Sequence, residues 1–217
     1  AVAGLKHVKH PINAAYAVKT KSPHVMLSGA GAEEFAKEQG LEMVEDNMYF
    51  ATPKTMEWIE KLKQESKKNG TVGCVVLDKQ GNLTAGTSTG GMFKKRWGRI
   101  GDSPVIGAGT YADNNSCAVS CTGHGEYFIR HAVAFDVCAR YKYLKESVEK
   151  AADYIIHTEL NTNAGNGGLI AVDKLGNIAM PYNSGGMFRG FLYKEKGSPE
   201  IKKGCGIGKK IVVVGEK

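Results

Sequence analysis

The sequence lacks the features that mark a membrane protein, a disulfide-stabilised protein or a metal site. No apolar run approaches the ~18–20 residues of a membrane-spanning helix, and no signal peptide is visible. The five cysteines are an odd set without a C-x-x-C pair, and three of them lie inside apolar runs, which favours buried thiols in a reducing compartment. The six histidines form no metal-ligand cluster. We therefore expect a cytoplasmic protein that needs no metal for its chemistry and no membrane partner.

Acidic residues are fewer than basic ones, 22 against 29, which gives a net charge of +7. A basic face can bind nucleic acid. Much of this excess, however, lies in short tracts without regularly interleaved aromatic residues, such as Lys67-Lys68, Lys94-Lys95-Arg96 and Lys202-Lys203. We interpret these as solvated surface groups and expect no nucleic-acid partner. With 217 residues, the chain is long enough for one sizeable core, in one domain or at most two.

The stretch Asn69–Phe93 has the pattern of a β-hairpin. Val72–Asp78 is apolar and rich in β-branched residues, as in a buried strand. Gln80-Gly81-Asn82 supplies a turn, and Leu83–Thr89 is predicted to run back as a second strand.

Thr71 stands at the start of this hairpin, directly after a polar connector that ends in Asn69-Gly70. If the Gly70–Thr71 bond is cleaved, Thr71 carries both its hydroxyl and a free α-amine with a pKa of roughly 8. An N-terminal threonine of this kind supplies its own base. The alternative is a threonine that merely begins a strand.

The rest of the chain predicts alternating strands and helices. Before the hairpin, the expected elements are strands Ala1–Val8 and His24–Leu27, helices Pro11–Lys19 and Ala30–Gln39, and a helix that starts at Thr52-Pro53. After it, we expect a buried strand, Ser116–Thr122, and two helices, Glu126–Tyr141 and Glu146–Leu160.

The hairpin is repeated later in the chain. Val76–Phe93 aligns without a gap on Ala171–Phe188, including the Gly-Gly-Met-Phe ending. Strand pairs that alternate with helix pairs favour a layered fold with helices covering the sheets. Thr71 corresponds to Asn166, which carries no nucleophile. We therefore assign the chemistry to the first hairpin and a scaffold role to the second.

Three further stretches carry candidate site residues. Thr87-Ser88-Thr89 ends the strand that returns beside Thr71, so that a second hydroxyl there can orient the nucleophile. Arg99 and Asp102 lie three apart in a glycine-flanked loop. They can grip a carboxylate and an ammonium, or pair with each other or with solvent. Thr122–Gly125 joins a buried strand to a helix, where backbone amides can stabilise an oxyanion, although any such junction can carry glycines. We interpret His124 within it as structural.

In combination, these motifs resemble the plant-type L-asparaginases and isoaspartyl (β-aspartyl) peptidases, which are N-terminal-nucleophile hydrolases. The resemblance covers nearly all of Thr71–Phe188 and rests on NG-TVGCVVLDKQGNLTAGTSTGG, GRIGDSP, GAGTYADN, VSCTGHGE and GGLIAVDKLGN, in that order.

The resemblance implies an α/β fold, an αββα sandwich, in a precursor that cleaves itself between Gly70 and Thr71. Residues 1–70 would be the later part of an α subunit with its cleavable linker, and residues 71–217 the β subunit, both within one structural domain. The α and β chains would stay associated, two of each per molecule. The implied substrates are L-asparagine and β-aspartyl dipeptides.

The resemblance also implies the roles of the site residues. Thr71 would attack the side-chain amide or β-peptide carbonyl and form a β-aspartyl ester that water then hydrolyses, and Thr89 would assist it. Thr122 and the Gly123 amide would form the oxyanion hole. Arg99 would hold the substrate α-carboxylate, and Asp102, helped by the Gly125 backbone, the α-ammonium.

The chain departs from the family at its beginning. The family's α subunit starts with a strand carrying His-Gly-Gly-Ala-Gly, followed by a loop that binds structural sodium or potassium. Neither is found here, nor is an Asn from that region that completes the active site. The chain begins Ala1-Val2-Ala3-Gly4 and is expected to be processed, trimmed or partial.

Two alternatives stay open. One is a glycosylasparaginase-like amidase, in which Asp rather than Gly typically precedes the nucleophile. The other is a truncated, non-catalytic binding remnant of the family.

Overall fold

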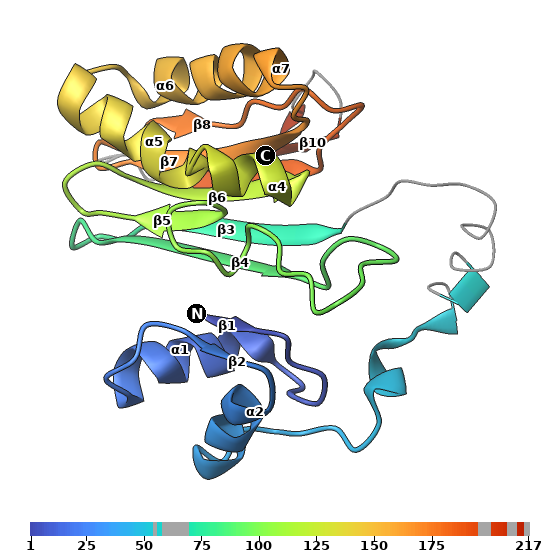
Figure 1. Ribbon diagram of the computed structural model, residues 1–217. Coiled ribbons are helices and arrows are strands. Elements are labelled where there is room, and N and C mark those ends of the chain that lie inside the picture. The colour runs from blue at the N-terminus through green and yellow to red at the C-terminus, as the bar shows by residue number, and fades with distance from the viewer. Residues whose placement is uncertain (54–55, 58–69, 195–200, 208–211, 215–217) are drawn as a thin grey trace.

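The structure, a computed structural model, stacks a helical layer, two β-sheets and a second helical layer (Figure 1). It describes residues 1–53, 56–57, 70–194, 201–207 and 212–214. The mixture of strands and helices agrees with the predicted α/β class.

The central sheet is antiparallel and has the order β5-β6-β7-β8. Its strands are β5 (Thr110–Ala112), β6 (Cys117–Gly123), β7 (Gly167–Asp173) and β8 (Ile178–Ala179). Strand β6, predicted as Ser116–Thr122, is buried from Cys117 to Cys121. Successive side chains of a strand point to opposite faces. On β6, Val119 thus packs against the helices and Ala118 against the other sheet, which explains the uninterrupted apolar run.

The first hairpin forms the second sheet, with β3 (Thr71–Leu77) antiparallel to β4 (Leu83–Thr89). The register pairs Thr71 with Thr89, which confirms the predicted return of a hydroxyl beside Thr71. One face of the hairpin lies on β6 and β7. The two sheets approach closely at Gly73, where a Cβ atom would lie 2.1 Å from Ser120 Oγ.

Strand β3 is not fully buried, contrary to the prediction. The side chains of Val72 and Val76, on its outer face, are 69% and 47% exposed, whereas Thr71, Gly73, Val75 and Leu77 face the central sheet. An apolar run records which residues are hydrophobic, but tertiary packing decides how many of them are covered.

The second hairpin repeats the turn of the first. In the first turn, Asn82 donates its backbone and side-chain N–H groups to the two carboxylate oxygens of Asp78, and Asn177 does the same to Asp173. The returning strand β8 spans only two residues, and Pro181 follows shortly after it. Proline cannot donate to a ladder, which accounts for the early end of the strand.

Helices cover the outer face of the central sheet: α4 (Gly125–Arg130), α5 (Val133–Ala139), α6 (Val148–Tyr154) and α7 (Leu160–Thr162). A π-helical turn, Arg140–Leu144, follows α5, and another, Ile155–Glu159, joins α6 to α7. The main core lies between these helices and β6–β7, and its largest side chains include Phe128, Ile155, Ile156 and Leu169.

The helix predicted over Glu126–Tyr141 is broken, which corrects the sequence analysis. Ala132 has a left-handed backbone (φ 46°) and separates α4 from α5. The first backbone N–H groups of α5 donate hydrogen bonds to the loop before β5: Ala134 N–H donates to Ala108 O, and Phe135 N–H donates to Gly107 O. In contrast, the helix predicted over Glu146–Leu160 runs without a break from Val148 through α7.

The N-terminal part contains α1 (Pro11–Lys21), α2 (Gly29–Glu38), a 3-10 turn (Asn47–Phe50) and the parallel pair β1 (Val2–Ala3) and β2 (Leu27–Ser28). Helix α1 packs on β4. Both helices agree with the predictions. The strands are shorter than the predicted Ala1–Val8 and His24–Leu27, and Val8 makes only an isolated bridge to Met43. Most of the helix expected after Thr52-Pro53 lies outside the described residues.

A separate antiparallel sheet ends the chain, formed by β9 (Arg189–Lys194), β10 (Ile201–Gly206) and β11 (Val212–Val214). Within the residues described, no helix is long and apolar enough to cross a membrane.

Candidate active site

The Gly70–Thr71 peptide bond lies beside a pair of threonine hydroxyls. Thr71 Oγ1 donates to Thr89 Oγ1 (3.3 Å), and Thr89 Oγ1 donates to the Gly70 carbonyl oxygen (2.8 Å). The Gly91 backbone N–H donates to Thr89 Oγ1 (3.0 Å) and so fixes the orientation of that hydroxyl. One side chain therefore contacts both the predicted nucleophile and the carbonyl of the predicted cleavage site.

More hydroxyls lie next to this pair, between the sheets. Thr87 Oγ1 is 2.7 Å from Ser120 Oγ on β6 and accepts from Thr110 Oγ1 on β5. These hydrogen bonds tie the nucleophile hairpin to the central sheet. Thr87 was a candidate from the sequence, but its partners Ser120 and Thr110 were not, because they come from other strands.

Thr122 and Gly123 end strand β6, which packs against the strand that begins with the predicted nucleophile, Thr71. Along the interface between the sheets, Val75 and Leu77 pack with Ala118, and Gly73 lies against Ser120. Because the side-chain period of a strand is two, the next step brings Thr71 toward Thr122. A Cβ atom on Gly123 (φ 149°) would lie 2.4 Å from Asn166 O, so this position requires glycine.

Arg99 is held by a carboxylate that the sequence analysis did not anticipate. Its Nε and Nη2 atoms donate to Glu126 Oε1 and Oε2, both at 2.8 Å. The bidentate bonds from Arg99 lower the pKa of Glu126 to about 2. Arg99 thus does not pair directly with Asp102, which was one of the alternatives for this loop. Its terminal edge, Nη1 and Nη2, is where a second carboxylate can bind.

Asp102 is the most unusual charged group of the site. Its side chain is only 6% exposed, and Oδ2 is among the buried polar atoms that have no hydrogen-bond partner in the described part of the chain. Burial raises the pKa of this carboxyl from 3.8 to about 6, although the nearby Arg99 opposes the shift. A cation that bound Oδ2 would satisfy this orphaned oxygen.

Gly125 brings Arg99 and Asp102 together at the start of α4. A Cβ atom at Gly125 would lie 2.7 Å from Asp102 Oδ1 and 3.1 Å from Arg99 Nη2. The absence of a side chain therefore permits a close approach of the loop to the strand–helix junction. The neighbouring His124 does not belong to this contact, since its ring lies against Tyr127 and near Glu126.

The structure brings together most of the predicted residues, in two groups. Gly70, Thr71 and Thr89 form the first group, and Arg99, Asp102 and Gly125 form the second. Glu126 and the Gly91 amide were missed. The only sequence signal for Glu126 was a carboxylate directly after the Gly123-His124-Gly125 turn.

A hollow of about 350 Å³ lies next to the predicted cleavage site, lined by Gly70 and Gly90–Lys95. Within the described ranges, no three His, Cys, Asp or Glu residues cluster to hold a metal ion.

Comparison with known proteins finds one matching family, described as asparaginase, over residues 1–201. An isoaspartyl peptidase of Salmonella typhimurium is 47% identical over 207 residues, which are 89% of this chain and 66% of that protein. A probable isoaspartyl peptidase/L-asparaginase 2 of Arabidopsis thaliana is 43% identical, over 88% of this chain and 67% of that protein. The chain thus spans about two thirds of the length of these relatives.

A relative from another branch matches a shorter region. An N(4)-(beta-N-acetylglucosaminyl)-L-asparaginase of Elizabethkingia miricola is 46% identical over 136 residues, which are 59% of this chain and 39% of that protein. The matches confirm the predicted resemblance, and those that cover most of the chain carry isoaspartyl peptidase names.

Proposed function

Because the chain belongs to the asparaginase family, we propose that it is a self-cleaving amidohydrolase that acts on L-asparagine and β-aspartyl dipeptides, with Thr71 as its nucleophile. The observation that carries the proposal is the position of the Thr89 hydroxyl, which accepts from Thr71 Oγ1 and donates to the Gly70 carbonyl oxygen.

Self-cleavage is the first step. Thr71 Oγ1 attacks the Gly70 carbonyl carbon and gives its proton to Thr89 Oγ1, while the Thr89 hydroxyl passes its own proton to the carbonyl oxygen and so neutralises the charge that forms there. When the C–N bond then breaks, this proton moves to the departing Thr71 nitrogen, which becomes a free amine, and the Gly70 acyl group is left on Thr71 Oγ1 as an ester. Water hydrolyses this ester, which leaves residues 1–70 with a carboxylate and Thr71 with a free amine.

The matured site uses the same nucleophile with a new base. The free Thr71 amine, with a pKa of roughly 8, can take the proton from its own hydroxyl. Thr71 Oγ1 then attacks the side-chain carbonyl of the substrate, and Thr122 with the Gly123 amide stabilises the oxyanion. Ammonia or the amine of a peptide leaves, and water hydrolyses the β-aspartyl ester.

The second group of residues would recognise the aspartyl part of the substrate. The unpartnered Asp102 Oδ2 is suited to an α-ammonium, and the free edge of Arg99 to an α-carboxylate. Both groups are free in L-asparagine and in a β-aspartyl dipeptide. In an α-aspartyl dipeptide the α-carboxylate is part of the peptide bond.

Intact-mass analysis under denaturing conditions tests the proposal. The wild-type protein, incubated in native buffer, should separate into residues 1–70 and 71–217. Thr71→Ala should stay whole, and Thr89→Ala should cleave much more slowly. Asn166→Ala, at the equivalent place in the second hairpin, is the matched control and should cleave normally. A folded wild-type protein that stays whole, or a Thr71→Ala variant that still cleaves, would contradict the proposed nucleophile.

A substrate pair tests recognition. The matured protein should hydrolyse β-Asp-Leu and refuse α-Asp-Leu. Arg99→Ala should lower kcat/KM for L-asparagine by roughly 30- to 1,000-fold, because a desolvated carboxylate would lose its bidentate partner. Equal hydrolysis of the two dipeptides would rule out this clamp.

A glycosylasparaginase-like activity is the second candidate, because one relative, an N(4)-(beta-N-acetylglucosaminyl)-L-asparaginase, is 46% identical over 136 residues. Gly70 rather than Asp precedes Thr71, which speaks against it. Hydrolysis of N-glycosylated asparagine at a higher kcat/KM than β-Asp-Leu would favour it. A non-catalytic remnant would show neither cleavage nor turnover.

Further features of the family belong to the same proposal. The stacking of helices, two sheets and helices supports an αββα sandwich of the N-terminal-nucleophile type. The association of residues 1–70 with residues 71–217 after cleavage, the pairing of two such units, a structural sodium or potassium ion and a cytoplasmic location all stay predictions.

A further inference from the structure

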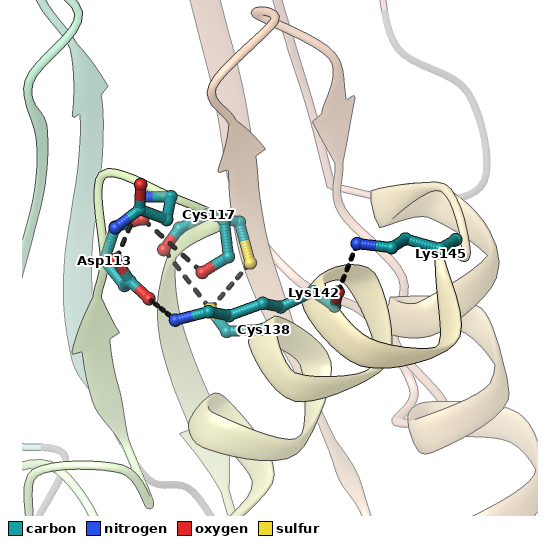
Figure 2. A network of polar contacts seen from close by, with 7 residues as sticks. Asp113, Cys117, Cys138, Lys142 and Lys145 are labelled. Atoms are coloured by element: carbon teal, nitrogen blue, oxygen red, sulfur yellow. Dashed lines mark hydrogen bonds and ion pairs between the residues drawn. The ribbon is translucent and has the colours of Figure 1, made fainter.

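Two of the buried cysteines lie in direct contact, and one of them begins β6, the strand that Thr122 and Gly123 end. Cys117 begins β6, and Cys138 lies on α5. Their Sγ atoms are 2.6 Å apart, and the two side chains are directed toward each other between the strand and the helix (Figure 2). Cys117 is fully buried, and Cys138 is 2% exposed.

This separation lies within roughly 0.6 Å of a disulfide bond, which measures about 2.05 Å. A small movement of either sulfur atom would close this gap. We propose that Cys117 and Cys138 are a site of covalent modification, at which oxidation forms a disulfide that joins β6 to α5 in the folded protein. This inference is independent of the proposed function.

A polar link joins the same parts of the fold next to the cysteines. Lys142, in the turn after α5, donates to Asp113 Oδ2 (3.0 Å) in the turn before β6 (Figure 2). Cys138 Sγ also donates to the Cys117 carbonyl oxygen (3.2 Å). The end of the helix is thus held on the start of the strand by contacts at and next to the thiol pair.

The two thiols also differ in acidity. The hydrogen bond from Cys117 lowers the pKa of the Cys138 thiol, and the same contact, with burial, raises the pKa of Cys117. Cys138 is therefore the better nucleophile and Cys117 the thiol that resolves the intermediate.

The oxidant must be small, because the pair is buried, and hydrogen peroxide fits this requirement. The Cys138 thiolate attacks one peroxide oxygen and becomes a sulfenic acid, and the other oxygen leaves as water after it takes up a proton. Cys117 sulfur then attacks the Cys138 sulfur, forms the S–S bond and releases a second water. Two thiols lose two electrons in total, and one peroxide is reduced to two waters.

Cys121 is the natural competitor. It is buried on the same face of β6 as Cys117. Because the hydrogen bonds of the described residues include a sulfur–sulfur contact from Cys138 to Cys117 and none to Cys121, the geometry selects Cys117.

Peptide mapping tests the proposal. The background is Cys74→Ser with Cys205→Ser, which removes the two exposed thiols and prevents links between molecules. The folded protein is treated with hydrogen peroxide, its remaining thiols are blocked, and it is digested after arginine without reduction. We expect loss of two of the three remaining thiols and a linked pair of peptides, residues 100–130 and 131–140.

Matched variants identify the partner. The linked pair should disappear in Cys117→Ala and persist in Cys121→Ala, made in the same background. The oxidised protein should melt roughly 5–10 °C higher than the reduced protein, because the link restrains the unfolded chain. A link through Cys121, a link that forms only in denaturant, or a lower melting temperature after oxidation would overturn the proposal.

Discussion

Asn in place of Asp102 should make the protein more stable and less active at the same time. Asp102 is 6% exposed, and its Oδ2 atom lacks a hydrogen-bond partner among the described residues. Its ionised form is therefore costly in the folded protein without substrate. Asp102→Asn removes this charge with almost no change in volume.

The magnitude follows from the pKa of this carboxyl. Burial raises it to about 6 from 3.8. At ~1.36 kcal/mol per pKa unit, a difference of about 2 corresponds to about 3 kcal/mol. Between these two values the folded state holds a proton that the unfolded state has lost. The free energy of unfolding must therefore fall as the pH rises from about 4 to about 6 and stay level above that range.

Urea unfolding of the wild type and of Asp102→Asn, at a series of pH values from 4 to 8, measures this effect. The variant has no carboxyl at position 102, so its free energy of unfolding should not fall with pH in this way. The difference in the free energy of unfolding between variant and wild type should therefore grow with pH to about 1–3 kcal/mol in favour of the variant. The lower value is expected if the new amide lacks a hydrogen-bond partner. Other carboxyls shift both curves equally and cancel. Glu34→Gln, which neutralises an exposed carboxylate on α2, is the control and should show no such difference.

The hydrolytic activity of Asp102→Asn should fall, although its stability rises. The substrate ammonium would lose a charged partner worth about 1.5–3 kcal/mol, so kcat/KM for L-asparagine should fall by roughly 10- to 150-fold. Cleavage at Gly70–Thr71 should continue, because Asp102 makes no contact with Thr71 or Thr89 in the hydrogen bonds described above. A stability difference that is flat between pH 4 and 8, or a variant with wild-type turnover, would refute this reasoning.

Two other substitutions, both at the start of α4, test the same group of residues. Gly125→Ala places a methyl group 2.7 Å from Asp102 Oδ1, so the KM for L-asparagine should rise at least tenfold. Intact-mass analysis of this variant should still show self-cleavage. An unchanged KM would mean that Asp102 does not bind substrate. Glu126→Gln removes the negative charge that holds Arg99, so we expect KM to rise by a larger factor than kcat falls, because the guanidinium is positioned less well but takes no part in the bond-breaking steps. Glu34→Gln again serves as the control. A fall in kcat with an unchanged KM would argue against a positioning role for Glu126.

Features that depend on neighbours in the chain could be predicted from the sequence. The turn residues Asp78 and Asn82 fix one hairpin, and the register that follows from the turn places Thr89 opposite Thr71. The same residue types at Asp173 and Asn177 identified the second hairpin. Hydrogen bonds between residues close in the chain specify these turns, so the two hairpins could be predicted from the sequence alone.

Features that depend on distant partners could not be predicted. The break at Ala132 arises because the loop Gly107-Ala108 takes the first amides of α5, and helical periodicity gives no sign of a competing acceptor. The exposure of Val72 and Val76 depends on what packs over β3, which an apolar run does not record.

The sequence by itself determined the class of the protein, its hairpins and the residue types of the site. Only the tertiary structure decided that Arg99 binds Glu126, that Asp102 is buried with an unpartnered oxygen and that Cys117 meets Cys138. Each of these depends on how closely separate elements pack. The pKa of a carboxyl, the free edge of a guanidinium and the distance between two sulfur atoms are set by burial and contact, which arise only when strands and helices far apart in the chain come together.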